Sequence, residues 1–153
     1  MNWTLQNGWR KTLSRGEERP CAWLRCMRGG FVARDAEGRV LARLLTGGGQ
    51  ARCTLSVQGT VLDVRMRYEA PETTPYYRAP RAVGAEFLKN GQPVRFTQEP
   101  NRDFTLSGAV NGTLSGLLGR TARIETDTED AALVAAVCLL ANAMLHADDV
   151  DVV

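Results

Sequence analysis

Residues 126–145 read TDTEDAALVAAVCLLANAML, and no other stretch constrains the architecture as strongly. From Ala131 to Leu145 every residue except Asn142 is apolar, so a helix formed here has no polar face. A helix lying on the outside of a sheet would show a polar stripe. Fifteen residues are also too few to cross a bilayer, which needs roughly twenty. We therefore expect a buried helix, enclosed by a sheet that closes around it and so removes its own exposed edges.

The residues before this helix predict its start. Thr126 followed by Glu129 fits a capping box, which places Glu129 and Asp130 in the first turn, where the helix dipole favours acidic side chains. Asp127, Glu129 and Asp130 also have the chemistry of metal ligands, but N-capping explains them more simply. We expect no bound metal.

The rest of the chain predicts strands and turns. Strands are expected at 20–27, 31–34, 39–45 and 121–126, and in three hairpins: 51–57 with 60–68, 85–96 turning near Asn90-Gly91, and 104–118 turning at Asn111-Gly112. Residues 70–80 contain three prolines and are expected to form a loop. Tyr76 and Tyr77 in this loop either pack onto the barrel or stack on a ring of a ligand, and packing is the simpler expectation.

The hairpin 51–68 can be aligned residue by residue. A two-residue loop at Gln58-Gly59 pairs Cys53 with Val64 on an inner face, and it pairs Arg52 with Arg65 on the outer face. Arg67 lies one step further along that face. Because like charges directly opposite each other are destabilising, either an internal carboxylate, with Asp63 the nearest, or an external anion must offset them. Arg52, Arg65 and Arg67 are therefore the candidate anion-binding residues.

Charge is distributed unevenly over the 153 residues. Residues 1–81 carry fourteen Lys and Arg against seven Asp and Glu, whereas residues 82–153 carry five against ten. The asymmetry fits an anion-binding face, but it fits intramolecular neutralisation as well. Seventeen of the nineteen basic residues are Arg, a bias that a GC-rich bacterial genome also produces. The content of 44% hydrophobic and 24% charged residues is that of a soluble globular domain and excludes a multi-span membrane protein or a disordered tail.

The cysteines and the single histidine carry no catalytic or metal motif. Cys21 and Cys26 are five residues apart, which fits neither a zinc knuckle nor a redox pair, and Cys53 and Cys138 lie among apolar residues. We expect four free thiols in a cytoplasmic protein, since the N-terminus has no signal-peptide pattern. His146 has no partner base or nucleophile in the sequence and is expected to interact with the end of the helix.

The chain resembles the tubby-like group, namely the LURP-one-related and phospholipid scramblase families. The resemblance lies in residues 31–40, FVARDAEGRV, and in residues 130–137, DAALVAAV, which is similar to the C-terminal helix of those families. It implies one bacterial domain over residues 1–153: a mainly β, closed antiparallel barrel of about twelve strands around a buried C-terminal helix. Scramblases have a calcium-binding segment beside this helix, but residues 123–130 lack its ligand alternation. Tubby domains bind phosphoinositides through a basic cluster that cannot be aligned onto this chain.

The expected function is that of a non-enzymatic binding or scaffold module. Its expected ligand is an anionic lipid or another anion at Arg52, Arg65 and Arg67, with no cofactor and no specific nucleic acid. Two alternatives stay open: a small ligand-processing enzyme, and a structural subunit that assembles with itself or a partner. The expected location is the cytoplasm, peripheral to the membrane, with no transmembrane segment. The oligomeric state does not follow from the sequence.

Overall fold

The computed structural model of the protein describes residues 1–8, 10–46, 52–77 and 80–150, with only the backbone for Arg52 and residues 146–150. Within these residues, twelve strands precede one helix, α1 (Ala131–Val150). The strands are β1 (Asn2–Asn7), β2 (Lys11–Arg15), β3 (Pro20–Met27), β4 (Gly30–Arg34), β5 (Val40–Leu45), β6 (Arg52–Val57), β7 (Thr60–Tyr68), β8 (Ala82–Lys89), β9 (Gln92–Gln98), β10 (Phe104–Gly108), β11 (Gly112–Ser115) and β12 (Thr121–Thr126). A single 3-10 turn, η1 (Pro71–Thr73), follows β7.

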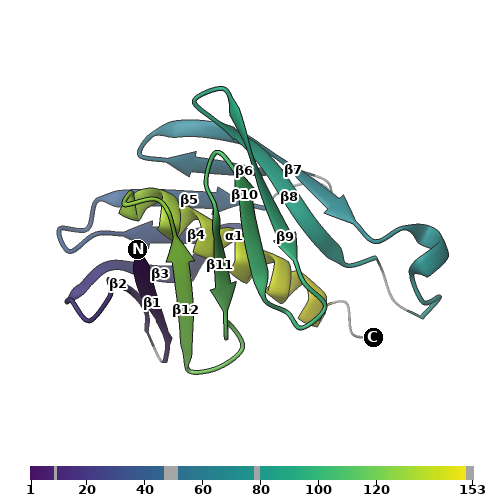
Figure 1. Ribbon diagram of the computed structural model, residues 1–153, viewed down its shortest axis with the longest axis horizontal. Coiled ribbons are helices and arrows are strands. Elements are labelled where there is room, and N and C mark those ends of the chain that lie inside the picture. The colour runs from purple at the N-terminus through teal and green to yellow at the C-terminus, as the bar shows by residue number, and fades with distance from the viewer. Residues whose placement is uncertain (9, 47–51, 78–79, 151–153) are drawn as a thin grey trace.

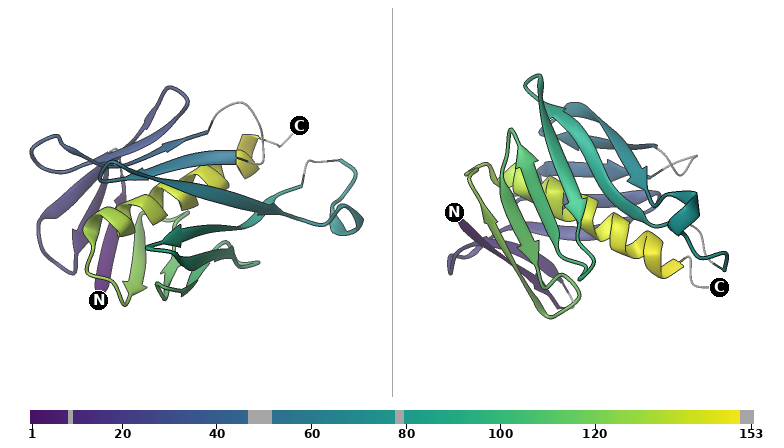
Figure 2. Two further views of the ribbon diagram at one scale, coloured as in Figure 1. Left: turned by 90° about the horizontal axis from the view of Figure 1, so that it is seen from above. Right: turned by 45° about the vertical axis from the view of Figure 1, so that its right-hand side comes forward.

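The strands form a closed barrel around the helix. Each strand pairs antiparallel with its neighbours in the chain, and β1 also pairs with β12, which closes the sheet (Figure 1). The helix runs between opposite walls of the barrel, as the two views of Figure 2 show. The predicted closed antiparallel barrel around a buried C-terminal helix is therefore confirmed.

The core lies between the helix and the inward-facing strand residues. Every residue from Ala132 to Ala141 is at most 3% exposed, which explains why this helix has no polar face. The strands contribute alternate residues to the same core, for example Leu13, Leu55 and Leu114. The rings of Phe96 and Phe104 stack with their centroids 4.7 Å apart. Burial of each large apolar side chain stabilises the fold by about 1.5–3 kcal/mol.

The hairpin β6–β7 has the predicted register. Arg52 pairs with Arg65, Cys53 with Val64 and Val57 with Thr60. Both loop residues have positive φ, 49° at Gln58 and 83° at Gly59, which is the geometry of a two-residue turn that follows the twist of the strands. The turn near Asn90-Gly91 and the last strand, 121–126, are confirmed as well.

The predicted turn at Asn111-Gly112 is wrong. Leu106 pairs with Gly112, so that five residues, 107–111, lie between these two partners, and Gly112 begins β11 instead of forming the turn. Asn111 is held instead by Asp127: its backbone N–H donates to Asp127 Oδ1 at 3.0 Å, and its side-chain amide donates to Oδ2 at 3.1 Å. The backbone N–H of Asp127 donates in return to the Asn111 carbonyl at 3.1 Å. These bonds to a residue far along the chain outweigh the local preference for a tight Asn-Gly turn.

The helix begins later than the capping box predicts. Asp130 is the N-cap, since its Oδ1 accepts the backbone N–H of Ala132 at 3.1 Å. Its own N–H donates to Thr128 Oγ1 at 3.2 Å, and the Thr126 hydroxyl donates to the Thr128 carbonyl at 3.1 Å. The prediction that Thr126 caps the helix, with Glu129 and Asp130 in its first turn, is therefore wrong. Glu129 and Asp130 therefore precede the first turn of the helix, which begins at Ala131.

Two further regions differ from expectation. The sequence assigned no strand to residues 1–19, but β1 and β2 lie there, and β1 pairs with β12 to close the barrel.

The loop after β7 projects from the barrel in Figure 1 instead of packing onto it. Tyr76 is fully exposed and Tyr77 is 68% exposed, so the expectation that these rings pack onto the barrel is wrong.

Candidate anion-binding face

The predicted arginines lie on the outer face of β6 and β7. Arg65 and Arg67 alternate with the inward residues Val64 and Met66 and are exposed. Arg52 is opposite Arg65 in the register, but its side chain lies outside the described residues. A Cβ atom added to Gly84 on β8 would lie 2.8 Å from Arg67 Nη2, so the Arg67 guanidinium lies directly over this glycine. The structure thus places Arg65 and Arg67 on one outer surface.

An acid on the next strand accompanies Arg65. Glu86 of β8 is its register partner, and Glu86 Oε2 lies 3.7 Å from Arg95 Nε on β9. Among the described residues no ion pair joins Asp63, the acid that the sequence favoured, to Arg65 or Arg67. Arg52, Arg65 and Arg67 are called the β6–β7 arginines below. Glu86 lies on the row between Arg65 and Arg95 and pairs with Arg95.

A second set of arginines lies on the outer face of β3, β4 and β5. Val32 is paired with Arg25 on one side and with Arg43 on the other, and Arg34 is paired with Trp23. Val32 faces outward, yet it is only 1% exposed, because longer side chains on the neighbouring strands cover it. Arg25, Arg34 and Arg43 are called the β3–β5 arginine cluster below. No acid in the described part of the chain forms an ion pair with any of the three.

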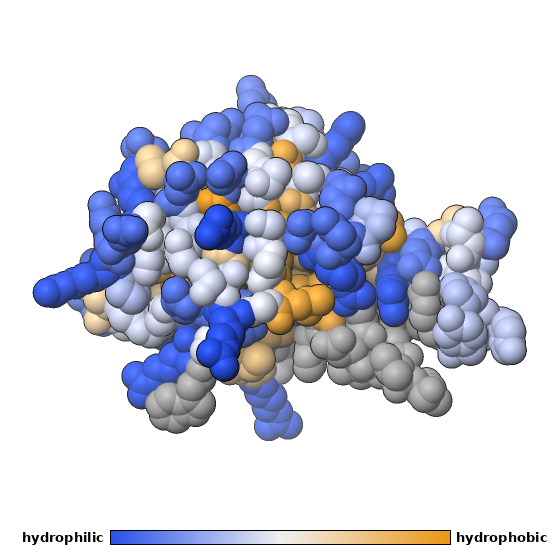
Figure 3. Space-filling model, turned by 60° about the horizontal axis from the view of Figure 1, so that its bottom comes forward, coloured by the Kyte–Doolittle hydropathy of each residue, from blue (hydrophilic) through white to orange (hydrophobic). Residues whose placement is uncertain are grey.

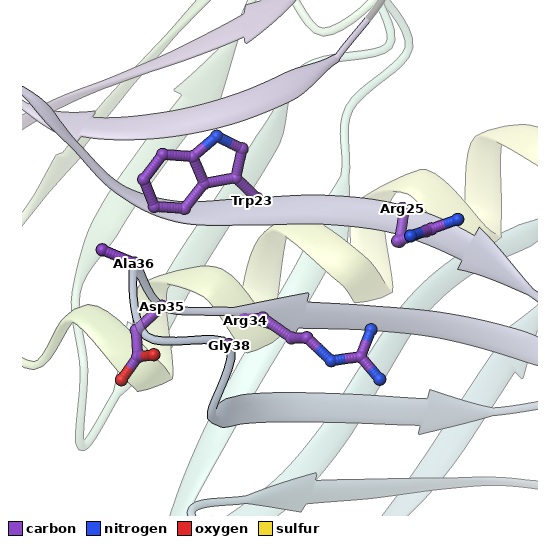
Figure 4. Close-up of a pocket in the computed structure, with 6 residues that line it drawn as sticks. All are labelled: Trp23, Arg25, Arg34, Asp35, Ala36 and Gly38. Atoms are coloured by element: carbon purple, nitrogen blue, oxygen red, sulfur yellow. The ribbon is translucent and has the colours of Figure 1, made fainter.

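Two members of this cluster, Arg25 and Arg34, border a surface hollow of about 260 Å³. Trp23, Arg25, Arg34 and the turn residues Asp35, Ala36 and Gly38 line it. In Figure 4 the Trp23 ring and the Asp35 carboxylate lie toward one end, and the guanidinium groups of Arg25 and Arg34 reach toward the other. The arrangement offers an aromatic surface at one end and two cations at the other.

The carboxylate of Asp35, the acid in this hollow, accepts its hydrogen bonds from residues of its own turn. Its Oδ1 accepts the backbone N–H groups of Glu37 and Arg39, at 3.0 and 2.9 Å, and its Oδ2 accepts Arg39 Nε at 3.1 Å. Partial burial raises the pKa of Asp35, but these hydrogen bonds and the Arg39 charge together lower it below its usual value. Asp35 is thus held ionised by Arg39 and makes no ion pair with Arg34.

The side chain of Arg43 has a hydrogen-bond donor without an acceptor. It is half-buried, and its Nε is enclosed and has no hydrogen-bond partner. An enclosed donor without an acceptor is destabilising, and an acceptor supplied from outside would remove that cost. Arg43 and Arg25 are on the same row of the sheet, with Val32 between them.

Sequence reasoning missed the β3–β5 arginine cluster. The alternation of Trp23 and Arg25 with buried Ala22 and Leu24 was a usable signal for an outer face on β3. Joining it to Arg34 and Arg43 required the registers of two further strand pairs, one of which contains a bulge between Ala33 and Arg34. A bulge shifts the alternation by one residue and cannot be located from a single sequence.

The acids before the helix have structural roles. Asp127 holds Asn111, Asp130 caps the helix, and Glu129 Oε1 lies 3.5 Å from Arg15 Nη2. The described residues contain no group of three His, Cys, Asp or Glu side chains close enough to hold a metal ion. All four cysteines are free, as expected. The side chain of His146 lies outside the described residues.

No described helix is both long enough and apolar enough to span a membrane. No protein family model, no curated protein and no solved structure matches this chain.

Proposed function

We propose that this protein is a non-enzymatic binding module of the tubby-like group, whose outer barrel face binds a phosphate-bearing anion. The observation that supports this is the β3–β5 arginine cluster: Arg25 and Arg34 line a hollow, Arg43 is half-buried two strands from Arg25, and none of the three forms an ion pair with a described acid. The β6–β7 arginines, which already have Glu86 beside them, form the flank of the same face.

The chemistry of the cluster favours phosphate. A guanidinium presents a planar fork of N–H donors that matches two phosphate oxygens at once, and such charge-assisted bonds are stronger than neutral ones. The enclosed Nε of Arg43 requires an acceptor, and a doubly charged group suits several neighbouring cations. The helix fills the interior of the barrel, which supports binding at the outer surface over processing of a substrate inside.

Two sources could supply the phosphate: a soluble molecule, or the headgroup of an anionic lipid. Because its cysteines are free, the proposed location is the cytoplasm, peripheral to the membrane in the case of lipid. Titration with pyrophosphate and sedimentation with vesicles of phosphatidylserine and phosphatidylcholine distinguish the two sources. Either interaction should weaken as salt shortens the screening length to about 8 Å at physiological ionic strength.

The variant Arg34→Gln combined with Arg43→Gln tests the site. It should reduce binding of pyrophosphate or of the anionic vesicles by about tenfold or more, since each lost charged hydrogen bond contributes roughly 1.5–3 kcal/mol. Arg123→Gln, which removes an exposed arginine on the outer face of β12, is the matched control and should bind as wild type does. If wild type binds neither probe at low salt, or if both variants bind equally, the proposal is wrong.

The β6–β7 arginines have their own test. Arg52→Ala with Arg65→Ala should weaken vesicle binding without lowering the melting temperature, because a pair of like charges has been removed. A clearly less stable double variant would mean that these arginines serve internal pairing, with Glu86 the nearest partner, and contribute nothing to the anion site.

The alternative that the chain is a structural subunit makes a different prediction. A self-assembling subunit would sediment as an oligomer whose formation is insensitive to loss of Arg34 and Arg43. Sedimentation velocity of wild type and of the Arg34→Gln, Arg43→Gln variant separates this alternative from anion binding.

A further inference from the structure

The two ends of the barrel differ in how well the helix fills them. Near the start of α1 the enclosed space between the helix and strands β10 and β12 is about 10 Å³, hardly enough for one water molecule. Near the later half of the helix, where Leu139 and Asn142 face β2, β3 and β4, a hollow of about 230 Å³ opens. Figure 3, which brings the lower side of Figure 1 forward, shows hydrophobic side chains open to the surface among hydrophilic ones. We call this hollow the barrel mouth.

Asn142 is the polar residue that the helix α1 contributes to the lining of the barrel mouth. It is the one polar residue between Ala131 and Leu145, and it is only 8% exposed. No hydrogen bond joins its side-chain amide to any residue that the structure describes, although this amide lines the hollow. The atoms of this amide are not among the fully enclosed side-chain atoms that lack a partner, so the amide reaches the open hollow and is available to a group that enters the mouth.

Lys11 brings a positive charge to the same mouth. Leu13 on β2 is fully buried inside the barrel, so Lys11, two residues before it, also faces the inner side. Burial raises the pKa of the Cys138 thiol to about 12, and the Lys11 charge opposes part of that rise. Cys138 is one helical turn before Asn142, which places the ammonium near this face of the helix. Lys11 forms no ion pair with a described acid.

The remaining walls are mainly apolar, and Arg25 lies at the rim. Leu24, which is paired with Lys11, and Phe31 and Leu139 surround the space, and the Cys26 thiol lies at its edge. A positive ammonium and an amide donor thus stand beside an apolar surface. That combination suits a ligand with an anionic oxygen group and an apolar body.

We propose that the barrel mouth binds a small monocarboxylate with a short alkyl chain. The carboxylate accepts hydrogen bonds from Lys11 Nζ and from the Asn142 amide, and the chain packs against Leu24, Phe31 and Leu139. The hollow of about 230 Å³, which is open to the surface, has room for a short alkyl chain, and we take hexanoate as the probe. This site adjoins the phosphate site proposed above at Arg25 and does not depend on it.

The experiment titrates the intact, isotope-labelled protein with hexanoate and follows its amide signals by NMR. Saturable shifts are expected at the backbone amides of Lys11, Cys26 and Phe31 and at the side-chain amide of Asn142. Hexan-1-ol, which has the chain without the carboxylate, should bind at least about tenfold more weakly, because it cannot pair with the ammonium.

The chain offers a matched control, because it has two lysines. Lys11→Met should weaken hexanoate binding by about tenfold or more, whereas Lys89→Met, on the exposed end of β8, should leave it unchanged. Asn142→Leu keeps the volume and removes the amide, and it should also weaken binding. As a readout that needs no variant, hexanoate should slow the alkylation of Cys26 by iodoacetamide in the wild-type protein.

The proposal is overturned if hexan-1-ol binds as tightly as hexanoate, if Lys11→Met retains the affinity, or if Cys26 is not protected. Failure here is distinguishable from failure of the phosphate site. Lys11→Met should still bind pyrophosphate, and Arg34→Gln with Arg43→Gln should still bind hexanoate. Arg25 is left unchanged in every variant because it borders both hollows.

Discussion

Replacing Leu140 with alanine tests the role of the central helix. Leu140 is 0% exposed and lies in the middle of α1, with buried helix residues on both sides and the strands around it. The truncation removes apolar contacts and leaves a cavity that closely packed barrel walls cannot fill. Such changes cost about 2–5 kcal/mol. That is a large part of the roughly 5–15 kcal/mol by which a domain of this size is stable.

Urea unfolding followed by circular dichroism measures this cost. The midpoint should fall while the slope against urea stays constant, because the surface exposed on unfolding hardly changes. For a chain of this length each kcal/mol lowers the melting temperature by about 2–4 °C, so a decrease of roughly 4–20 °C is expected. Leu140→Asp, or Val137→Asp, should yield no soluble folded protein, because an unpaired charge would lie inside the barrel.

Leu118→Ala is the matched control. Leu118 undergoes the same truncation in the turn between β11 and β12, where it is 66% exposed, so its effect should stay within about 0.5 kcal/mol. If Leu140→Ala costs no more than Leu118→Ala, or if Leu140→Asp folds and melts as wild type does, then the helix is not the core of the barrel and the reasoning fails.

Three further predictions concern local features. Asp130→Ala should lower the unfolding free energy by about 0.5–2 kcal/mol in urea, because the N-cap is lost, whereas Glu129→Ala, which breaks only an exposed ion pair, should cost less than about 1 kcal/mol. Cys26, which is exposed, should react first with a thiol reagent at pH 8, and equal reactivity of all four cysteines in the folded protein would contradict the structure. Burial raises the pKa of the Cys53 and Cys138 thiols to about 11 and about 12, so these should react only on unfolding. Hydrogen bonds from Asn111 lower the pKa of Asp127, and the pKa of Asp35 is lowered as well. Both ionised carboxylates therefore stabilise the fold above the unfolded-state pKa of about 4, and this contribution is lost as the pH falls below that value. Asp127→Asn should therefore flatten the acid limb of the curve of melting temperature against pH, and an unchanged acid limb would refute the assignment.

Local rules predicted the parts of the fold whose partners lie nearby in the sequence. The β6–β7 register follows from a two-residue loop and the alternation of its strands, and the structure reproduces it pair by pair. The central helix follows from composition alone, because a helix without a polar face can only be enclosed. The prediction of a tight turn at Asn111-Gly112 failed for the opposite reason: Asp127, sixteen residues further along the chain, determines the conformation of Asn111.

The candidate site was harder to predict than the fold. The outer position of Arg65 could be derived, but its neighbour Glu86 depends on how β8 is aligned after the long loop and on a bulge between Arg67 and Tyr68. The β3–β5 arginine cluster needed three strands in register across another bulge. Sites on the surface of a sheet combine residues from several strands, so each uncertain register multiplies the possible combinations.

The enclosed helix also determines where binding can take place in this fold. From Ala132 to Ala141 its side chains occupy the lumen without interruption, and the space left near the start of the helix is about 10 Å³. A ligand therefore has two kinds of place available: the outer surface of the strands, and the end where the helix approaches the rim. The first polar helix residue after the apolar stretch, Asn142, lies at that rim, and Lys11 faces it from β2. Arg25, at the boundary between the two hollows, is the one described residue that lines both, so the two proposed sites are neighbours: charge dominates on the outer face, whereas the mouth combines an apolar wall with Lys11 and, at its rim, Arg25.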